Sequence, residues 1–245
     1  MLKFFRQIRQ RLIRENRFSK YLLYAIGEVV LIVIGIWIAL QLNNWNSERL
    51  DQIESNKYLA KLEQEMGALI SYYNDQKIFR LSDHQKALDA LKFIESCGEK
   101  KEYEDSFMQT MVSHQILSKY GEIRNTYEEM IAVGAFSAIP DKELKSKIFF
   151  AFNELTDGQT QIDYYRDELG RASTVINNQV SFSYNSESEL TARYEVANLC
   201  RDVAFRNAVV EVIDAREDYI RGLDIISSAM SEAREAIRMF NNRTK

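Results

Sequence analysis

The sequence contains little glycine and almost no proline. Nine Gly and one Pro make 10 of 245 residues, about 4 %, where ordinary chains carry roughly 12 %. This scarcity excludes turn-rich β-sandwiches, collagen-like repeats and proline-rich disorder. The two cysteines are too few for a disulfide framework or for a zinc site made of cysteine alone. An apolar content of 46 % is enough for a core, and the composition predicts an all-α protein.

Motifs for catalysis are also missing. His84 and His114 are the only histidines, and they form no H-E-x-x-H pair. The nucleophile elbow G-x-S-x-G, the phosphate loop G-x-x-x-x-G-K-[ST] and the dinucleotide motif G-x-G-x-x-G do not occur. Acidic pairs such as Glu128 and Glu129 are typical of solvated helix faces. We therefore expect a non-enzymatic protein with no cofactor and no metal site.

Charge is distributed unevenly along the chain. Residues 1–20 carry seven basic side chains and one acid, residues 21–42 carry only Glu28, and residues 43–245 carry 25 basic and 34 acidic side chains. The three net charges of +6, −1 and −9 add up to the overall −4. This layout predicts a basic cytoplasmic segment, a membrane span and an acidic body. Lipid explains the basic cluster better than nucleic acid does.

The segment 21–42 reads YLLYAIGEVVLIVIGIWIALQL. Its 22 residues would form a helix about 33 Å long, enough to cross a bilayer core of roughly 30 Å. A cleaved signal peptide fits less well, because the run is long and Ala39, Leu40 and Gln41 do not form a small-x-small site. The excess of basic residues before the segment places the N-terminus in the cytoplasm. We expect a single-pass anchor in the inner membrane.

The first 20 residues have a helical pattern of their own. Phe5, Ile8 and Leu12 recur at spacings of three and four with arginines between them, which is typical of an amphipathic helix on an anionic membrane surface. A frayed tail held by charge alone is the alternative. The basic residues expected to contact lipid are Arg6, Arg9, Arg11, Arg14, Arg17 and Lys20.

Glu28 is the most unusual residue, because an acid inside a membrane span is costly unless it has a partner. Gly35 and Ala39 follow it by seven and eleven residues, which places all three on one helix face. Gly35 and Ala39 also form a small-xxx-small pair, which permits close helix contact. We interpret this face as a packing or polar site. The alternatives are an ion relay in an energised complex, or a Glu28 side chain that reaches toward the cytoplasmic surface.

The body, residues 43–245, has helical periodicity almost throughout. The apolar spacing of Leu59, Leu62, Met66, Leu69 and Tyr73 predicts that a helix over 47–80 continues from the span. Helix starts are predicted near Ser82, Thr126, Asp141 and Ser186, a helix end at Gly134 and a turn at Asp157–Gly158. The Ser-rich stretch from Val180 to Ser188 is expected to connect helices.

The clearest pattern is at the C-terminus, where ten positions repeat at spacings of three and four over 203–241. Only Arg216 interrupts the apolar character of this seam. We expect an antiparallel helical bundle with long first and last helices, and a core within the chain rather than an oligomeric coiled coil. The seam consists of Val209, Val212, Arg216, Tyr219, Leu223, Ile226, Met230, Ala233, Ile237 and Phe240.

The stretch FFRQIRQRLIRENRFSKYLLYAIGEVVLIVIGIWIALQLNNWN, and a weaker echo at 125–144, resemble an uncharacterised single-pass membrane protein family that is widespread in Bacteroidota. The resemblance implies an anchored helical protein of a Gram-negative cell, with the acidic body in the periplasm. It implies no activity. In that compartment Cys97 and Cys200 are compatible with a disulfide, and equally with two reduced, packed thiols.

Three functions are consistent with these features. We expect an anchored periplasmic interaction or scaffold protein that binds a second copy of itself or another membrane protein. The alternatives are an accessory subunit of an energised or transport complex that uses Glu28, and a periplasmic ligand sensor. The sensor alternative is weakened because only about 20 residues would face the cytoplasm.

Overall fold

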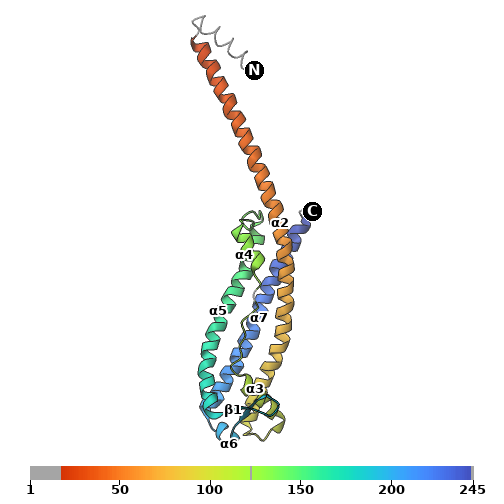
Figure 1. Cartoon of the computed structure of the whole chain (residues 1–245), viewed down its shortest axis with the longest axis vertical. Coiled ribbons are helices and arrows are strands. Elements are labelled where there is room, and N and C mark those ends of the chain that lie inside the picture. Colours follow the sequence, from red (N-terminus) through yellow and green to blue (C-terminus); the bar gives the residue numbers. More distant parts are fainter. Residues whose placement is uncertain (1–17, 122, 244–245) are drawn as a thin grey trace. The chain divides into compact units, whose positions relative to one another are not determined.

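The computed structural model describes residues 18–121 and 123–243. Within these ranges the protein is all-α, as the composition predicts, apart from one short β-hairpin (Figure 1). The elements in chain order are α2 (Phe18–Glu95), the 3-10 helix η1 (Lys101–Tyr103), α3 (Glu104–Ser113), α4 (Asn125–Ala132), α5 (Lys142–Gln179), β1 (Ser181–Tyr184), β2 (Leu190–Arg193), α6 (Val196–Leu199) and α7 (Val203–Arg243).

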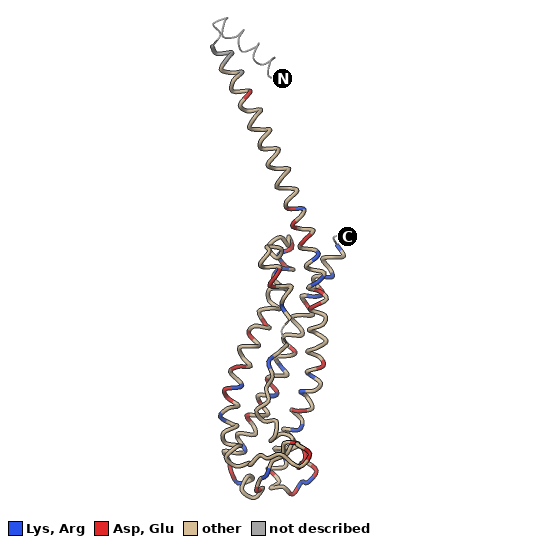
Figure 2. The backbone as a smooth tube through the Cα atoms, viewed as in Figure 1, with Lys and Arg blue, Asp and Glu red and all other residues tan. Residues whose placement is uncertain are grey.

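The chain divides after Glu54 into two compact units, and α2 runs through this division. The described part of the first unit is the beginning of α2. It includes a stretch long and apolar enough to cross a membrane, and none of that stretch is buried. In Figure 2 it is almost free of charged residues. Length and composition of this kind are shared by membrane anchors and signal sequences.

In the second unit, α7 packs against the later part of α2 in the opposite direction. Arg238 Nε lies 2.7 Å from Glu63 Oε1, and Lys77 Nζ lies 2.7 Å from Asp224 Oδ1. The two residue numbers add up to 301 in both pairs, which defines an antiparallel register. Figure 1 shows α5 beside α7, again in the opposite direction.

The apolar stripe predicted along the first long helix is confirmed. Leu59, Leu62, Met66, Leu69 and Tyr73 are at most 1 % exposed and belong to one core cluster with residues of α5 and α7. Their spacing of three and four residues keeps them on a single face of α2. This face is the side of α2 on which the second unit builds its core.

α2 does not end near residue 80 but continues to Glu95, so the helix start predicted at Ser82 is wrong. Ala87, Ala90 and Ile94 return to the same face of the helix and are buried. Most helix stability in proteins comes from such packing rather than from local signals. Burial of Ala87, Ala90 and Ile94 therefore outweighs the local signal for a new helix at Ser82.

The signals around α4 and the start of α5 are confirmed. α4 begins at Asn125, next to the start predicted at Thr126. Gly134 follows the helix with a φ of +80°, a conformation that glycine adopts without strain. The Asp141 side chain caps α5 by accepting hydrogen bonds from the first backbone N–H groups of that helix, the shorter being 2.9 Å from Glu143.

The turn predicted at Asp157 and Gly158 is wrong, because α5 continues through both residues. A Cβ atom at Gly158 would lie 2.9 Å from Cδ1 of Ile226 and 3.0 Å from the ring of Tyr120. This glycine therefore permits close contact between α5, α7 and the segment that carries Tyr120. Its role is packing rather than chain reversal.

The polar stretch from Val180 to Ser188 does connect helices, but as part of the β1–β2 hairpin. The Asn185 side chain accepts hydrogen bonds from the backbone N–H groups of Glu187 and Glu189, both at 2.9 Å. These bonds close the hairpin turn where a helix start is predicted at Ser186. That prediction is wrong, because the backbone N–H groups of Glu187 and Glu189 bond the Asn185 side chain in a turn rather than a helix cap.

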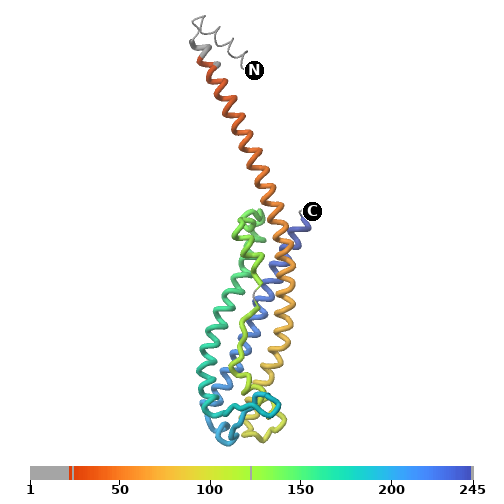
Figure 3. Tube along the Cα trace, viewed as in Figure 1, coloured from red at the N-terminus to blue at the C-terminus, as the bar shows by residue number. Residues whose placement is uncertain are grey.

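An extended segment links α3 to α4 and runs along the three long helices (Figure 3). Tyr73 Oη of α2 donates to the carbonyl of Gly121 at 2.7 Å, and Gln159 Nε2 of α5 donates to the carbonyl of Tyr120 at 2.6 Å. Tyr120 Oη donates to the carbonyl of Tyr219 in α7 at 3.1 Å. Side chains thus satisfy a buried backbone that has no helical partners.

The last long helix, α7, places its predicted seam inside the chain's own core. All ten seam positions are buried except Phe240, which is half-buried.

A disulfide lies at the end of the second unit where α2 ends. It joins Cys97, after α2, to Cys200, after α6, with Cα atoms 5.1 Å apart. The bridge ties together the ends of α2 and of the segment that leads into α7.

Candidate functional site

Glu28, Gly35 and Ala39 lie on the first part of α2, and all three are exposed. A Cβ atom at Gly35 would meet nothing within 4 Å. Since seven and eleven residues are close to whole numbers of helical turns, the three residues share one face. This face combines an acid with two small residues and is open to contact with another helix.

The basic residues predicted to contact lipid are not characterised by the structure. Arg6, Arg9, Arg11, Arg14 and Arg17 lie outside the described residues, and Lys20 lies in the first turn of α2. Their role stays a prediction.

The histidines do not come together. His84 lies in α2, whereas His114 is buried after α3 and stacks on Phe182 with ring centroids 5.7 Å apart. His114 Nδ1 bonds the carbonyl of Met111, and its Nε2 lies 3.1 Å from Ser173 Oγ. Within the described ranges, no group of three or more His, Cys, Asp or Glu side chains is placed to hold a metal ion.

Burial lowers the pKa of the His114 imidazole, and the charge of Arg216 acts in the same direction, while the bond to Met111 opposes both. The His114–Ser173 pair has no carboxylate bonded to Nδ1, as a catalytic triad would require. Ser173 is 6 % exposed and lies near the C-terminal end of α5. We therefore interpret this pair as a buried structural network.

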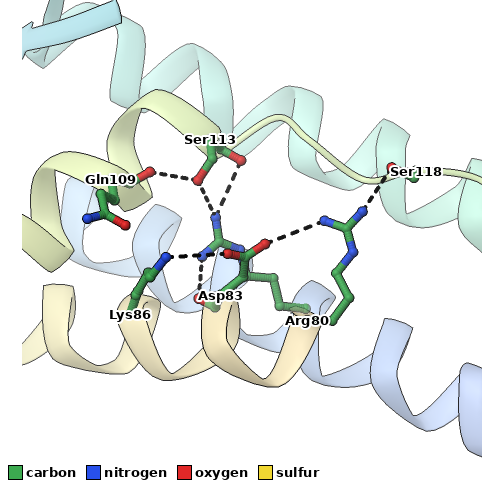
Figure 4. Close-up of polar contacts among 7 residues, drawn as sticks. Arg80, Asp83, Lys86, Gln109, Ser113 and Ser118 are labelled. Carbon is green, nitrogen blue, oxygen red and sulfur yellow. Dashed lines mark hydrogen bonds and ion pairs between the residues drawn. The ribbon is translucent and has the colours of Figure 1, made fainter. Parts of the chain in front are cut away.

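The polar cluster around Arg216 is not among the sites predicted from the sequence. This side chain is only 7 % exposed, although it is charged. Its Nη1 donates to the carbonyl of Asp83 at 2.6 Å, and its Nη2 donates to Oγ and O of Ser113 at 2.9 and 3.3 Å (Figure 4). One guanidinium thus joins α7 to α2 and to the end of α3.

A second guanidinium lies beside the first. Arg80 of α2 forms an ion pair with Asp83 at 3.5 Å and donates to Ser118 Oγ at 2.9 Å, as Figure 4 shows. Its Cζ lies 5.3 Å from the ring centroid of Tyr219. Lys86 lies 3.9 Å from the other carboxylate oxygen of Asp83. Three cations therefore surround a single carboxylate.

The electrostatics of the cluster follow from burial. Loss of water lowers the pKa of the Arg216 guanidinium, the nearby Asp83 raises it, and the charge of Arg80 lowers it. Among the described residues, no carboxylate oxygen lies within 4 Å of the Arg216 guanidinium. Its hydrogen-bond partners are neutral oxygens, so they satisfy its N–H groups without neutralising its charge.

A cavity of about 320 Å³ adjoins the cluster. Its polar lining comes from Arg80, Asp83, Lys86, Ser113 and Arg216, together with Gln109 and Thr110, and its apolar lining from Phe79, Val112 and Ile116. The cavity lies wholly within the second unit, between α2, α7 and the α3 region. It is the place where a small ligand would meet buried positive charge.

One signal in the sequence marks this cluster. Arg80 and Asp83 occupy positions of the α2 stripe that are apolar before and after them, and Arg216 interrupts the α7 seam. In the antiparallel register of α2 and α7 these interruptions face each other. Either interruption alone is ambiguous, but their coincidence indicates a polar site inside the core.

A second cavity, of about 420 Å³, lies at the hairpin end of the unit and is lined mainly by amide and other polar side chains. Two of its amide side chains are already paired within the chain: Asn177 Nδ2 donates to Ser173 Oγ, and Gln179 Nε2 donates to Asp202 Oδ2 at 2.9 Å. Among the described residues, the lining of this cavity has no buried polar side-chain atom without a hydrogen-bond partner, whereas the lining beside Arg216 has two.

No family model, curated protein or solved structure gives a significant match to this chain.

Proposed function

We propose that this protein is a single-pass membrane protein that carries a helical bundle in the periplasm and acts by association rather than by catalysis. The observation that carries the proposal is the open face of Glu28, Gly35 and Ala39 on an unburied apolar helix. In a bilayer, small residues permit close helix contact, and an acid favours a face that meets protein or water. The partner is a second copy of this chain or another membrane protein.

The Cys97–Cys200 disulfide supports a location outside the cytoplasm. Disulfides persist in oxidising compartments and are rare where thiols are kept reduced. The charge distribution supports the same topology, since the seven basic residues precede the span and the acidic body follows it. We therefore propose an inner-membrane anchor with a cytoplasmic N-terminus.

The test is the composition and mass of the complex extracted from native membranes in mild detergent. We expect either a homo-oligomer or a complex with a further membrane protein in a fixed ratio. A clean monomer in detergent and in cross-linked native membranes would contradict the association. The second condition is needed because detergent can dissociate a genuine membrane complex.

The interface is tested by substitutions on opposite sides of the span. Ala39→Leu adds bulk to the proposed face and should reduce the cross-linked complex, whereas Val30→Phe adds bulk to the far side and should leave it unchanged. Equal effects of the two variants would argue against a specific face. Glu28→Gln tests the accessory-subunit alternative, because ion coupling requires the ionisable carboxyl and packing does not.

A further inference from the structure

The cavity beside Arg216 takes no part in the membrane association proposed above, and its chemistry points to a ligand. Its volume of about 320 Å³ is near the lower end of the range of roughly 300–1,000 Å³ for small-molecule sites. Figure 4 shows the charged and polar side chains of the lining converging from α2 and the α3 region. A ligand of modest size would touch several of them at once.

The charges of the lining define the polar end of such a ligand. Asp83 contacts Arg80 and Lys86 but bonds Arg216 only through its backbone carbonyl. The three cations of the lining, Arg80, Lys86 and Arg216, thus share one carboxylate, and the buried Arg216 makes no direct ion pair with it. Burial of an unpaired charge is costly, and a single negative charge placed in the cavity would offset this cost. A guanidinium is also suited to planar oxyanions.

Two residues of the cavity lining also carry buried polar atoms that lack partners. Thr110 is fully buried, and its hydroxyl has no hydrogen-bond partner among the described residues. Arg80 Nε is likewise buried and unpartnered. Buried polar groups are rarely left unsatisfied, so this part of the lining is short of hydrogen-bond partners.

The remaining lining defines the rest of the ligand. Phe79 and Ile116 both line the cavity, and each is 57 % exposed. Val112 is half-buried between the polar residues of α3. An apolar group resting on these side chains would remove apolar surface from water. The ligand therefore needs one charged end and one apolar end.

We propose that this cavity binds a small monocarboxylic acid with an apolar body, with its carboxylate at Arg216 and Arg80 and its body against Phe79 and Ile116. Inorganic phosphate is disfavoured, because the Asp83 carboxylate also lines the cavity and phosphate has no apolar group to cover Phe79 and Ile116. Such binding would give the protein the ligand dependence of the sensor alternative, whether or not the span associates.

A purely structural role for Arg216 makes different predictions. In that case the guanidinium only joins α7 to Asp83 and Ser113, and no anion binds. Experiments must therefore detect the ligand itself and not only the stability of the fold.

The test uses the full chain in lipid nanodiscs, with isothermal titration of hexanoate at pH 7 and empty nanodiscs as the blank. Hexanoate is short enough to stay largely in water and carries one negative charge. We expect saturable binding at one site per chain. Neutral hexanamide and inorganic phosphate should each bind at least about tenfold more weakly. No saturable hexanoate binding, or equal binding of hexanamide or phosphate, would overturn the proposal.

Variants locate the site. Arg216→Gln should weaken hexanoate binding at least about tenfold, whereas Arg221→Gln, the same change at an exposed position of α7, should not. Because Arg216→Gln can also disturb packing, Ile116→Glu provides a second test at an exposed position. It places a negative charge at the cavity and should abolish binding, while Ile116→Gln should retain it. Unchanged affinity in Ile116→Glu would place the ligand elsewhere and overturn the assignment.

Discussion

The guanidinium of Arg216 donates to the backbone carbonyl of Asp83 at 2.6 Å, across 133 residues of sequence. The bond joins α7 to α2 at the position along both helices where polar residues interrupt their apolar stripes. Ser113 brings the end of α3 to the same guanidinium. A single buried side chain therefore fixes three elements of the second unit and also lines its candidate ligand cavity.

Replacement of Arg216 by methionine should destabilise the second unit. The carbonyls of Asp83 and Ser113 lose a charged donor, and each acceptor left unsatisfied costs about 1–3 kcal/mol, part of which is offset by removal of a buried charge. We expect a net loss of about 1–2 kcal/mol in urea unfolding of the full chain in nanodiscs. The matched control, Arg221→Met, removes a side chain that is 63 % exposed and should change stability by less than about 0.5 kcal/mol. Equal effects of both variants would argue against the role assigned to Arg216.

Two glycines of α5 should respond oppositely to alanine. At Gly158 the added Cβ would lie 2.9 Å from Ile226, and overpacking of about 1–3 kcal/mol exceeds the gain of about 1 kcal/mol in helix propensity. At Gly170 it would meet nothing within 4 Å, so only the gain remains. We expect a lower melting temperature for Gly158→Ala and an unchanged or higher one for Gly170→Ala. A stabilised Gly158→Ala protein would contradict the close contact between α5 and α7.

The long helices could be predicted because their apolar spacing persists over many turns. The stripe from Leu59 to Tyr73 and the seam from Val209 to Ile237 are both buried as expected. Local signals were less reliable wherever packing opposed them. Ser82 lies inside α2, because buried residues follow it and extend the helix. Gly158 lies inside α5, where it makes room for close packing rather than a turn.

The candidate site was harder to predict, because it depends on which helices face each other. Arg216 is visible in the sequence as a break in a seam, but its partners Asp83 and Ser113 lie more than 100 positions away. The pairing of Cys97 with Cys200 has the same origin, since the sequence permits it but does not require it. The spacing of residues predicts which of them share one face of a helix. To predict which residues of two helices touch, one must also know how the helices are aligned.

Loss of the Cys97–Cys200 disulfide should lower stability substantially. The bridge closes a loop of 103 residues, and restriction of the unfolded chain by a loop of that length is worth about 4–5 kcal/mol in the entropic model. We expect the double variant Cys97→Ser/Cys200→Ser to lose about 2–5 kcal/mol. Thermal unfolding with and without reductant checks this, because reductant should lower the melting temperature of the wild type and leave the double variant unchanged. A reductant effect of equal size on both proteins would show that the bridge is not its source.

The buried network of His114 implies a dependence of stability on pH. A backbone carbonyl can only accept, so His114 Nδ1 carries the proton that bonds Met111. Ser173 Oγ accepts from Gln115 Nε2 at 2.5 Å and from Asn177 Nδ2 at 3.2 Å, which leaves its own proton for His114 Nε2. In a protonated imidazole, Nε2 would also carry a proton, and this N–H would face the donating hydroxyl of Ser173 without an acceptor. The network therefore favours the neutral imidazole.

Since burial lowers the pKa of His114 in the folded protein, its stabilising contribution is fully present above the unfolded value of about 6.5 and is lost as the pH falls through the lowered folded-state pKa. The charge of Arg216 acts in the same direction. We expect the stability of the wild type to fall between pH 7.5 and pH 5, and His114→Gln to lose less over the same interval. Urea unfolding of both proteins at the two pH values measures this difference. If His114→Gln kept the full pH dependence, the carboxylates of the acidic body would account for it instead.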